Sequence, residues 1–269
     1  MRRIKTRIAI LYGVGLLAVL LPIIAAVLLA EHRSLQQQKD RANRLAGEIL
    51  SRSHRVTDQL AAALRELNAA QGSERCSDAN LDLMRKLVVK SHLLIDVGYV
   101  HNQEMVCSSF GRNAYRVGPP TYRGGGGYDV RTQVEHPLLP GSRLVISTDP
   151  KTGFSALVHE GAVLDVAPSD SRLTYGLVGV RSQTALFQHG AFDPAWQQNI
   201  GSAHESTFFD GNRIVAWNRS DRYDFAAYAA IPRSEIDHSW GQAMLVMLPV
   251  GAGAGLVLAL VVAQLVRLQ

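Results

Sequence analysis

The sequence predicts an α+β domain held between two membrane-spanning helices. Two long runs without a charged residue, 8–30 and 243–266, lie near the two ends of the chain. Between them, apolar residues first recur with the spacing of helices and then alternate with the period of two that is typical of β-strands. A chain that passes from helices to mostly antiparallel strands is typical of an α+β fold.

Each uncharged run is long enough to cross a lipid bilayer as a helix. At a rise of ~1.5 Å per residue, residues 8–30 extend ~35 Å, which exceeds a hydrocarbon core of ~30 Å, and residues 243–266 extend at least as far. The first run also fits a secretory signal peptide, but it is long for one, and no convincing small-x-small cleavage site precedes Glu31. We therefore expect two uncleaved membrane helices, with the lipid bilayer as a partner.

The charges indicate that both ends of the chain are cytoplasmic. Positive residues collect on the cytoplasmic side of membrane helices; here they flank the two runs at positions 2, 3, 5, 7 and 267. We expect cytoplasmic ends at 1–7 and 267–269 and an outer domain at 31–242, which is the periplasm in a Gram-negative cell. The positive charges of these five residues account for the whole net charge of +5. The outer domain therefore has no positive excess with which to bind nucleic acid.

Two helices are expected at the start of the outer domain. Segment 31–70 continues the first membrane helix, with apolar residues at near-heptad spacing: Leu45, Ile49, Val56, Leu60, Leu64 and Leu67. This seam fits a coiled-coil homodimer, and it also fits a helix that packs on the chain's own sheet. Ser77 is a suitable N-cap for a second helix over 78–90.

The rest of the outer domain is predicted to be mostly antiparallel sheet. Apolar residues alternate over 95–99, and a turn at 101–103 returns the chain as a partner strand at 104–109. A loop is expected at 111–127, and a helix is expected to begin at Pro232. Between them we expect strands at 128–135, 143–148, 154–159, 173–180, 204–209, 213–218 and 223–231. Two helices followed by such a sheet indicate a sensor domain of PAS or Cache character.

The sequence has no motif for catalysis, phosphate binding or metal binding. The nine histidines are scattered, without the HExxH or Cys-His spacing of metal sites. The glycine run 124–127 lacks the Lys-Ser/Thr of a phosphate-binding loop, and no GxSxG sequence occurs. We therefore expect neither catalytic residues nor a cofactor in this chain.

Cys76 and Cys107 are the only two cysteines, and both lie in the predicted outer region, where thiols are oxidised. We expect them to form a disulfide, with Cα atoms within ~7 Å of each other. Such a bond would close a loop of about 32 residues and would stabilise the fold by roughly 3.7 kcal/mol in the loop-entropy description. On physical grounds alone, a structural bond is the simplest interpretation.

The sequence around Cys107 resembles a known family. Val106-Cys107-Ser108-Ser109-Phe110-Gly111 follows a strand that contains Gly98-Tyr99, and it is similar to the CSS-motif domain, which is named for its Cys-Ser-Ser. That domain lies between two membrane spans in bacterial cyclic-di-GMP phosphodiesterases of the EAL type. The likeness extends over essentially the whole chain, from the first uncharged run to the second.

This resemblance implies a bacterial inner-membrane protein whose periplasmic domain regulates a cytoplasmic EAL phosphodiesterase. In the family the two cysteines form a disulfide that restrains the enzyme. Cys76 and Cys107 would therefore be the redox site, and Ser108 and Ser109 would complete the motif. Reduction or proteolytic processing would release the active form, with a periplasmic thiol oxidase and reductase as partners.

The EAL barrel of such phosphodiesterases is not in this sequence, which stops at Gln269. Its Mg or Mn ion is expected in that barrel and not in this chain. Two other functions share the predicted architecture: an input module of a chemoreceptor or histidine kinase, and a membrane-tethered scaffold with a structural disulfide. The residues that follow Gln269 in the reading frame would distinguish the three.

The predicted elements indicate how one disulfide can act across a membrane. The first membrane helix continues to the neighbourhood of Cys76, and the bond would join its end to the strand that carries Cys107. We expect that strand to share a sheet with 223–231, which leads into the second membrane helix. One covalent bond would then bias the relative position of the two membrane helices.

Overall fold

The computed structural model describes residues 2–70, 74–124, 126–164, 172–201 and 203–232, and from the remainder 241, 244–245, 249–257, 260–261 and 264. The chain forms two compact units. The sheet unit comprises 42–211 and 215–230, and the terminal unit comprises 1–41, 212–214 and 231–269.

The first element is one long helix, α1, from Arg2 to Ala69. It confirms the helix predicted over 31–70. Within the sheet unit the predicted heptad seam is buried by the chain itself, and each of its residues is at most 8% exposed: Leu45, Ile49, Val56, Leu60, Leu64 and Leu67. Of the two interpretations of this seam, the structure therefore shows packing within the chain. A coiled-coil homodimer through the same residues would require them to leave that core.

The sequence predicts membrane helices at 8–30 and 243–266. Residues 8–30 lie within α1, and residues 243–266 are described only in part. Among the described residues, the structure has no helix that is both long enough and apolar enough to cross a membrane.

The first sheet has seven strands in the order β3-β2-β1-β7-β6-β5-β4. Their bounds are Leu94–His101 (β1), Glu104–Ser108 (β2), Tyr115–Arg116 (β3), Tyr122–Arg123 (β4), Asp129–His136 (β5), Leu139–Thr148 (β6) and Phe154–His159 (β7). β1 and β2 form the predicted hairpin, with Tyr99 opposite Cys107. The apolar core of this sheet includes Val100, Met105, Val134, Leu144, Ile146 and Leu157.

The second helix of the sheet unit, α2 from Asp78 to Lys90, has the predicted bounds and contacts β1 and β2. Ser77 is its N-cap, and its side chain accepts a hydrogen bond from the backbone amide of Asn80. Leu81, Met84 and Leu87 are buried, and Val88 beside them is half-buried. A single turn of helix, α3 (Gly161–Leu164), follows β7.

The second sheet has five strands in the order β10-β11-β12-β8-β9. Their bounds are Thr174–Gly179 (β8), Ala185–His189 (β9), Glu205–Asp210 (β10), Arg213–Arg219 (β11) and Phe225–Pro232 (β12). The short helix α4 (Pro194–Ile200) contributes Trp196 to a core that also contains Trp217 and Tyr228.

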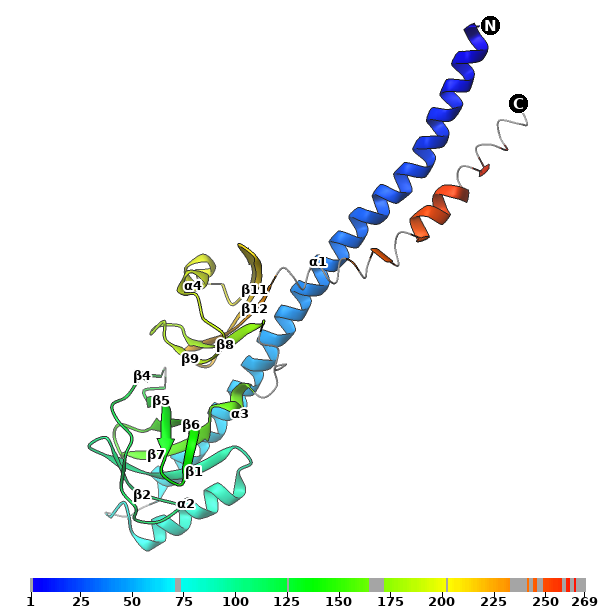
Figure 1. Ribbon diagram of the computed structural model, residues 1–269. Coiled ribbons are helices and arrows are strands. Elements are labelled where there is room, and N and C mark those ends of the chain that lie inside the picture. Colours follow the sequence, from blue (N-terminus) through cyan, green and yellow to red (C-terminus); the bar gives the residue numbers. More distant parts are fainter. Residues whose placement is uncertain are drawn as a thin grey trace. The chain divides into compact units, whose positions relative to one another are not determined.

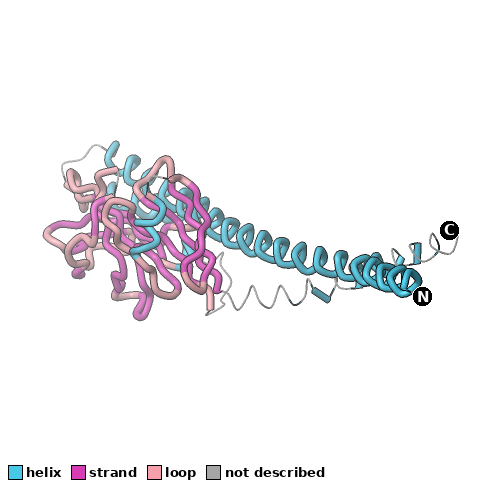
Figure 2. The backbone as a smooth tube through the Cα atoms, turned by 90° about the horizontal axis from the view of Figure 1, so that it is seen from above, coloured by secondary structure: helices cyan, strands magenta, loops and turns pink. Residues whose placement is uncertain are grey.

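Helix α1 runs past both sheets of the sheet unit and contacts a loop of each (Figures 1 and 2). Near its end, Asn68 bonds the turn between β6 and β7: its Nδ2 donates to Asp149 Oδ2, and its Oδ1 accepts from Thr152 Oγ1, both at 2.7 Å. Closer to the middle of α1, His54 Nε2 lies 2.8 Å from Ser220 Oγ, in the turn between β11 and β12. One helix therefore contacts the loops of two separate sheets.

The strand that carries Cys107 does not share a sheet with the last strand, contrary to the prediction. β2 lies in the seven-stranded sheet, whereas β12 lies in the five-stranded sheet. The first sheet ends on both sides with a two-residue strand, β3 or β4, and such short edges give little backbone for further strands to pair with. β2 and β12 are therefore not linked by strand pairing, and α1 is one element that contacts loops of both sheets.

Several short elements were not expected from the sequence. The predicted loop 111–127 contains β3 and β4, and no element was predicted for β9 or α4, because segments this short have too few residues to show a period. The prediction that a helix begins at Pro232 is wrong, since Pro232 is the last residue of β12. Residues 233–240 lie outside the described part of the chain.

Candidate functional site

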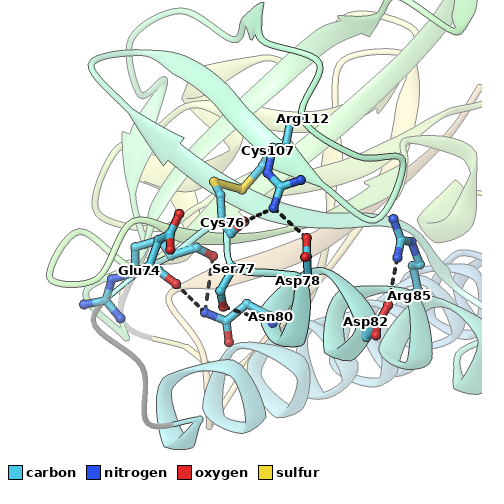
Figure 3. Close-up of polar contacts among 10 residues, drawn as sticks. Glu74, Cys76, Ser77, Asp78, Asn80, Asp82, Arg85, Cys107 and Arg112 are labelled. Atoms are coloured by element: carbon cyan, nitrogen blue, oxygen red, sulfur yellow. Dashed lines mark hydrogen bonds and ion pairs between the residues drawn. A yellow bond between two sulfur atoms is a disulfide. The ribbon is translucent and has the colours of Figure 1, made fainter.

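The two cysteines form a disulfide bond (Figure 3). Cys76 lies in the turn that leads into α2, and Cys107 lies on β2. Their Cα atoms are 6.0 Å apart, within the ~7 Å that a disulfide can bridge. The predicted pairing is therefore confirmed, and it joins the α1–α2 connection to the first sheet.

The turn that carries Cys76 is held by α2. Asn80 is buried, and its Nδ2 donates to the carbonyl oxygens of Glu74 and Arg75 at 3.0 and 3.3 Å (Figure 3). The backbone amide of the same residue donates to the Ser77 side chain. The first turn of α2 therefore positions Cys76 independently of the disulfide.

Two arginines add noncovalent contacts across the same junction. Arg112 Nη2 donates to the Cys76 carbonyl oxygen at 3.1 Å and to Asp78 Oδ1 at 2.6 Å (Figure 3). Arg85 Nε donates to the carbonyl oxygen of Ser109 at 3.2 Å. Both arginine side chains are more than half exposed, and exposed ion pairs contribute only ~0–1 kcal/mol. The disulfide, at about 3.7 kcal/mol, is the strongest of these connections.

The two cysteines differ in exposure. Cys107 is 0% exposed, whereas Cys76 is half-buried in its turn. Thiol–disulfide exchange requires that a thiolate reach one of the two sulfur atoms. Because Cys76 is the less buried of the two, we expect an external thiol to attack its sulfur. Attack on Cys76 would leave Cys107 as the buried leaving group.

The serines of the motif hold the end of β2 through hydrogen bonds. Asp96 of β1 is 0% exposed, and its Oδ1 accepts from the backbone amide and the hydroxyl of Ser109, at 3.1 and 2.6 Å. Ser108 Oγ accepts from the backbone amide of Phe110 at 3.2 Å. The motif thus combines a disulfide at Cys107 with a buried polar anchor immediately after it.

Asp96 belongs to a buried cluster with His136 and Tyr115. Asp96 Oδ2 lies 3.6 Å from His136 Nε2, and the rings of His136 and Tyr115 are 4.9 Å apart. Because His136 Nδ1 accepts from the backbone amide of Leu138, the proton of the neutral ring is on Nε2, toward Asp96. Asp96 Oδ2, His136 Nε2 and the Tyr115 hydroxyl have no hydrogen-bond partner among the described residues.

This cluster shifts the titration of its acidic groups. Burial raises the pKa of Asp96, and the hydrogen bonds from Ser109 oppose that rise. Burial also raises the pKa of Tyr115, and the negative charge of Asp96 adds to that effect. In the part of the chain that the structure describes, no group of three His, Cys, Asp or Glu side chains is placed to hold a metal ion.

Sequence reasoning identified the two cysteines and the two serines but missed Asp96. The available signal was a carboxylate inside an otherwise apolar strand, Leu94–His101. His136 and Tyr115 gave no such signal, because their proximity to Asp96 depends on strand pairing far along the chain.

Residues 38–244 match the family described as the CSS motif domain associated with EAL. The chain belongs to the CSS-motif family. The match begins within α1 and covers both sheets of this CSS-motif domain, so the resemblance seen around Cys107 extends over most of the chain. No curated protein matches the sequence.

Solved extracellular domains share the fold of this CSS-motif domain. The extracellular domain of rpHK1S-Z16, a proposed histidine kinase, matches with a TM-score of 0.51 and 13% identity, covering 75% of this chain and 97% of that chain. The corresponding domain of soHK1S-Z6 matches with a TM-score of 0.51 and 12% identity, covering 77% and 98%. The sensory domain of the Campylobacter jejuni chemoreceptor Tlp3 has a TM-score of 0.45 at 8% identity, covering 78% and 99%. The two kinase domains show that the fold is a Cache-like sensor fold.

The difference in exposure predicts unequal reactivity of the two thiols. In the folded Cys107→Ser variant, the Cys76 thiol is half-buried and should react with a maleimide at least about ten times faster than the Cys107 thiol of Cys76→Ser. The measurement is the rate of labelling by mass spectrometry under native conditions, with labelling in denaturant as the control for total thiol. Equal native rates would contradict the assignment of Cys76 as the attacked sulfur.

The raised pKa of Asp96 predicts a specific pH dependence of stability. A carboxyl group whose pKa is higher in the folded state favours folding fully below its ordinary value of 3.8, and this contribution is lost as the pH rises through the folded-state pKa. The free energy of unfolding of the wild type minus that of Asp96→Asn should therefore fall as the pH rises from about 4. Urea unfolding at a series of pH values measures it.

The matched control for this experiment is Asp82→Asn, because Asp82 is an exposed carboxylate on α2. The difference in free energy of unfolding between the wild type and Asp82→Asn should not show the fall with pH that is expected for Asp96→Asn. A difference for Asp96→Asn that is constant or rises with pH would contradict the account of Asp96.

Proposed function

We propose that this CSS-motif domain is the redox-responsive input region of a membrane-bound cyclic-di-GMP phosphodiesterase. The observation that carries the proposal is the Cys76–Cys107 bond in a domain whose family is associated with EAL. With the bond intact, a cytoplasmic EAL domain is restrained, and reduction releases it. The uncharged runs 8–30 and 243–266 support placement in the bacterial inner membrane, with both ends cytoplasmic and the sheets in the periplasm.

The chemical event in this proposal is a two-electron thiol–disulfide exchange. A thiolate of a periplasmic reductase attacks the Cys76 sulfur, forms a mixed disulfide and expels Cys107 as a thiolate. A second thiolate of the reductase then attacks the reductase sulfur of the mixed disulfide, which frees Cys76 and leaves the reductase oxidised. A thiol oxidase reverses the reaction in a compartment where disulfides persist.

Helix α1 is the element through which the bond would act. It ends at Ala69, shortly before Cys76, and it includes the predicted membrane run 8–30. Asp58 of α1 also accepts a hydrogen bond from the Tyr223 hydroxyl, just before β12. β12 leads to the segment that contains the second predicted membrane run. A displacement of α1 would therefore reach both connections to the membrane.

The energy of one disulfide is sufficient for such a switch. A hundredfold shift between two states requires a difference in free energy of ~2.7 kcal/mol. The loop-entropy value for a loop of this length, about 3.7 kcal/mol, is larger. The bond can then control the output if a substantial part of this energy distinguishes the two states.

The fold leaves a second output open. Extracellular domains of proposed histidine kinases have the same fold, so an input module of a kinase or chemoreceptor is the alternative. The association of the family with EAL favours the phosphodiesterase. A structural disulfide in a membrane-tethered scaffold is the third interpretation, and the experiment below distinguishes it.

Removal of the bond should activate the enzyme. In membranes from cells that produce the whole natural protein, Cys76→Ser and Cys107→Ser should raise cyclic-di-GMP hydrolysis to the same level, because each removes the same bond. Reductant should activate the wild type to that level and leave both variants unchanged. Hydrolysis is measured per amount of protein in the membrane.

The control is Leu144→Ala, a substitution of a fully buried core residue that costs ~2–5 kcal/mol without touching the bond. It separates signalling from loss of stability, because it should destabilise the domain without raising hydrolysis. Unchanged activity in both cysteine variants would show that the disulfide is structural. Absence of cyclic-di-GMP hydrolysis in every sample would contradict the phosphodiesterase output.

A further inference from the structure

A polar cavity of about 270 Å³ lies at one end of the seven-stranded sheet. It is formed where the β1–β2 turn and the β6–β7 turn meet the start of β5 and the end of β6. Its volume is near the lower end of the ~300–1,000 Å³ range of small-molecule sites. The lining side chains that matter for its chemistry are Tyr99, His101, Asp129, Arg131, Thr148 and Lys151.

Arg131 brings a buried positive charge to this cavity. It is only 5% exposed, and its Nε and Nη1 donate to the Gly118 carbonyl oxygen and to Thr148 Oγ1, at 2.8 and 2.9 Å. Both acceptors are neutral. Among the described residues no carboxylate forms an ion pair with Arg131, and its neighbour Asp129 is paired with Arg123 at 3.0 Å.

An unpaired buried guanidinium is costly, because charges in protein interiors are normally paired or bound to a ligand. Burial lowers the pKa of Arg131 by more than the negative charge of Asp129 raises it. The two side-chain hydrogen bonds that Arg131 donates to described residues come from Nε and Nη1. The exposed Lys151 adds a second positive charge at the rim. The charges in this cavity therefore favour a negatively charged ligand.

We propose that this cavity binds a small oxyanion, a molecule that presents a carboxylate or phosphate group to Arg131 and Lys151. Guanidinium groups bind such oxygens through charge-assisted hydrogen bonds. Tyr99 and His101 also line the cavity, with their ring centres 6.2 Å apart and their planes within 13°, and they offer aromatic contacts to the rest of the ligand. This site goes beyond the proposed function, which depends only on the disulfide.

The β6–β7 turn that lines the cavity is hydrogen-bonded to the end of α1. The backbone amide of Lys151 donates to Asp149 Oδ1 at 2.9 Å, while Asp149 Oδ2 accepts from Asn68 of α1. Thr152 bonds the same Asn68 side chain. An anion that orders this loop would therefore act on the end of α1 that precedes Cys76.

The test is isothermal titration of the oxidised full chain with sodium malonate and, separately, with sodium phosphate. Sodium chloride at matched ionic strength accounts for general salt effects. We expect saturable binding of at least one probe, with a Kd that rises at least about tenfold in Arg131→Gln and about threefold in Lys151→Gln. The probe that binds identifies the oxyanion as a carboxylate or a phosphate.

The matched control is Arg116→Gln, because Arg116 is exposed on β3 and does not line the cavity. Its Kd should equal that of the wild type. Absence of saturable binding of both probes would overturn the proposal, and so would an unchanged Kd in a folded Arg131→Gln variant. If Arg131→Gln does not fold, Lys151→Gln decides, and an unchanged Kd in that variant overturns the proposal. Neither result depends on phosphodiesterase activity.

Discussion

Burial of the apolar seam of α1 is the constraint on which the rest of the domain depends. Ile49, Leu64 and Leu67 are each 0% exposed, and burial of one such side chain contributes ~1.5–3 kcal/mol. The two sheets belong to different hydrogen-bonded ladders, yet the same helix bonds loops of both, at Asn68 and at His54. A change in the position of α1 would therefore alter its contacts with both sheets.

The disulfide ties the turn that follows α1 to the first sheet, which the Asn68 side chain of α1 also contacts through two hydrogen bonds. Arg112 and Arg85 cross the same junction, but both are exposed and each adds little. The buried anchor at Asp96 holds the end of β2 within the sheet and does not involve Cys76. Loss of the bond should therefore leave both sheets folded and loosen the last turns of α1 against the first sheet.

The parts of the fold that could be predicted are those with local patterns. The seam of α1, the bounds of α2 with its Ser77 cap, and the hairpin with Cys107 follow from spacing and capping. The division into two sheets could not be predicted, because it depends on which strands pair and not on their periods. Asp96 was missed, although its charge among the apolar residues of β1 was an available signal. Arg131 gave no signal, since its cavity forms only when two turns distant in sequence come together. Strand pairing is thus the information that the sequence patterns lack.

The central claim is that the disulfide acts through α1, and hydrogen–deuterium exchange of the oxidised and reduced full chain tests it most directly. The account predicts that reduction speeds exchange in the last turns of α1 and also in the turn between β11 and β12, where Ser220 and Tyr223 contact the helix. Cys76→Ser should give the same pattern without reductant. Faster exchange confined to 74–78 and 104–112, with α1 and the β11–β12 turn unchanged, would contradict the account.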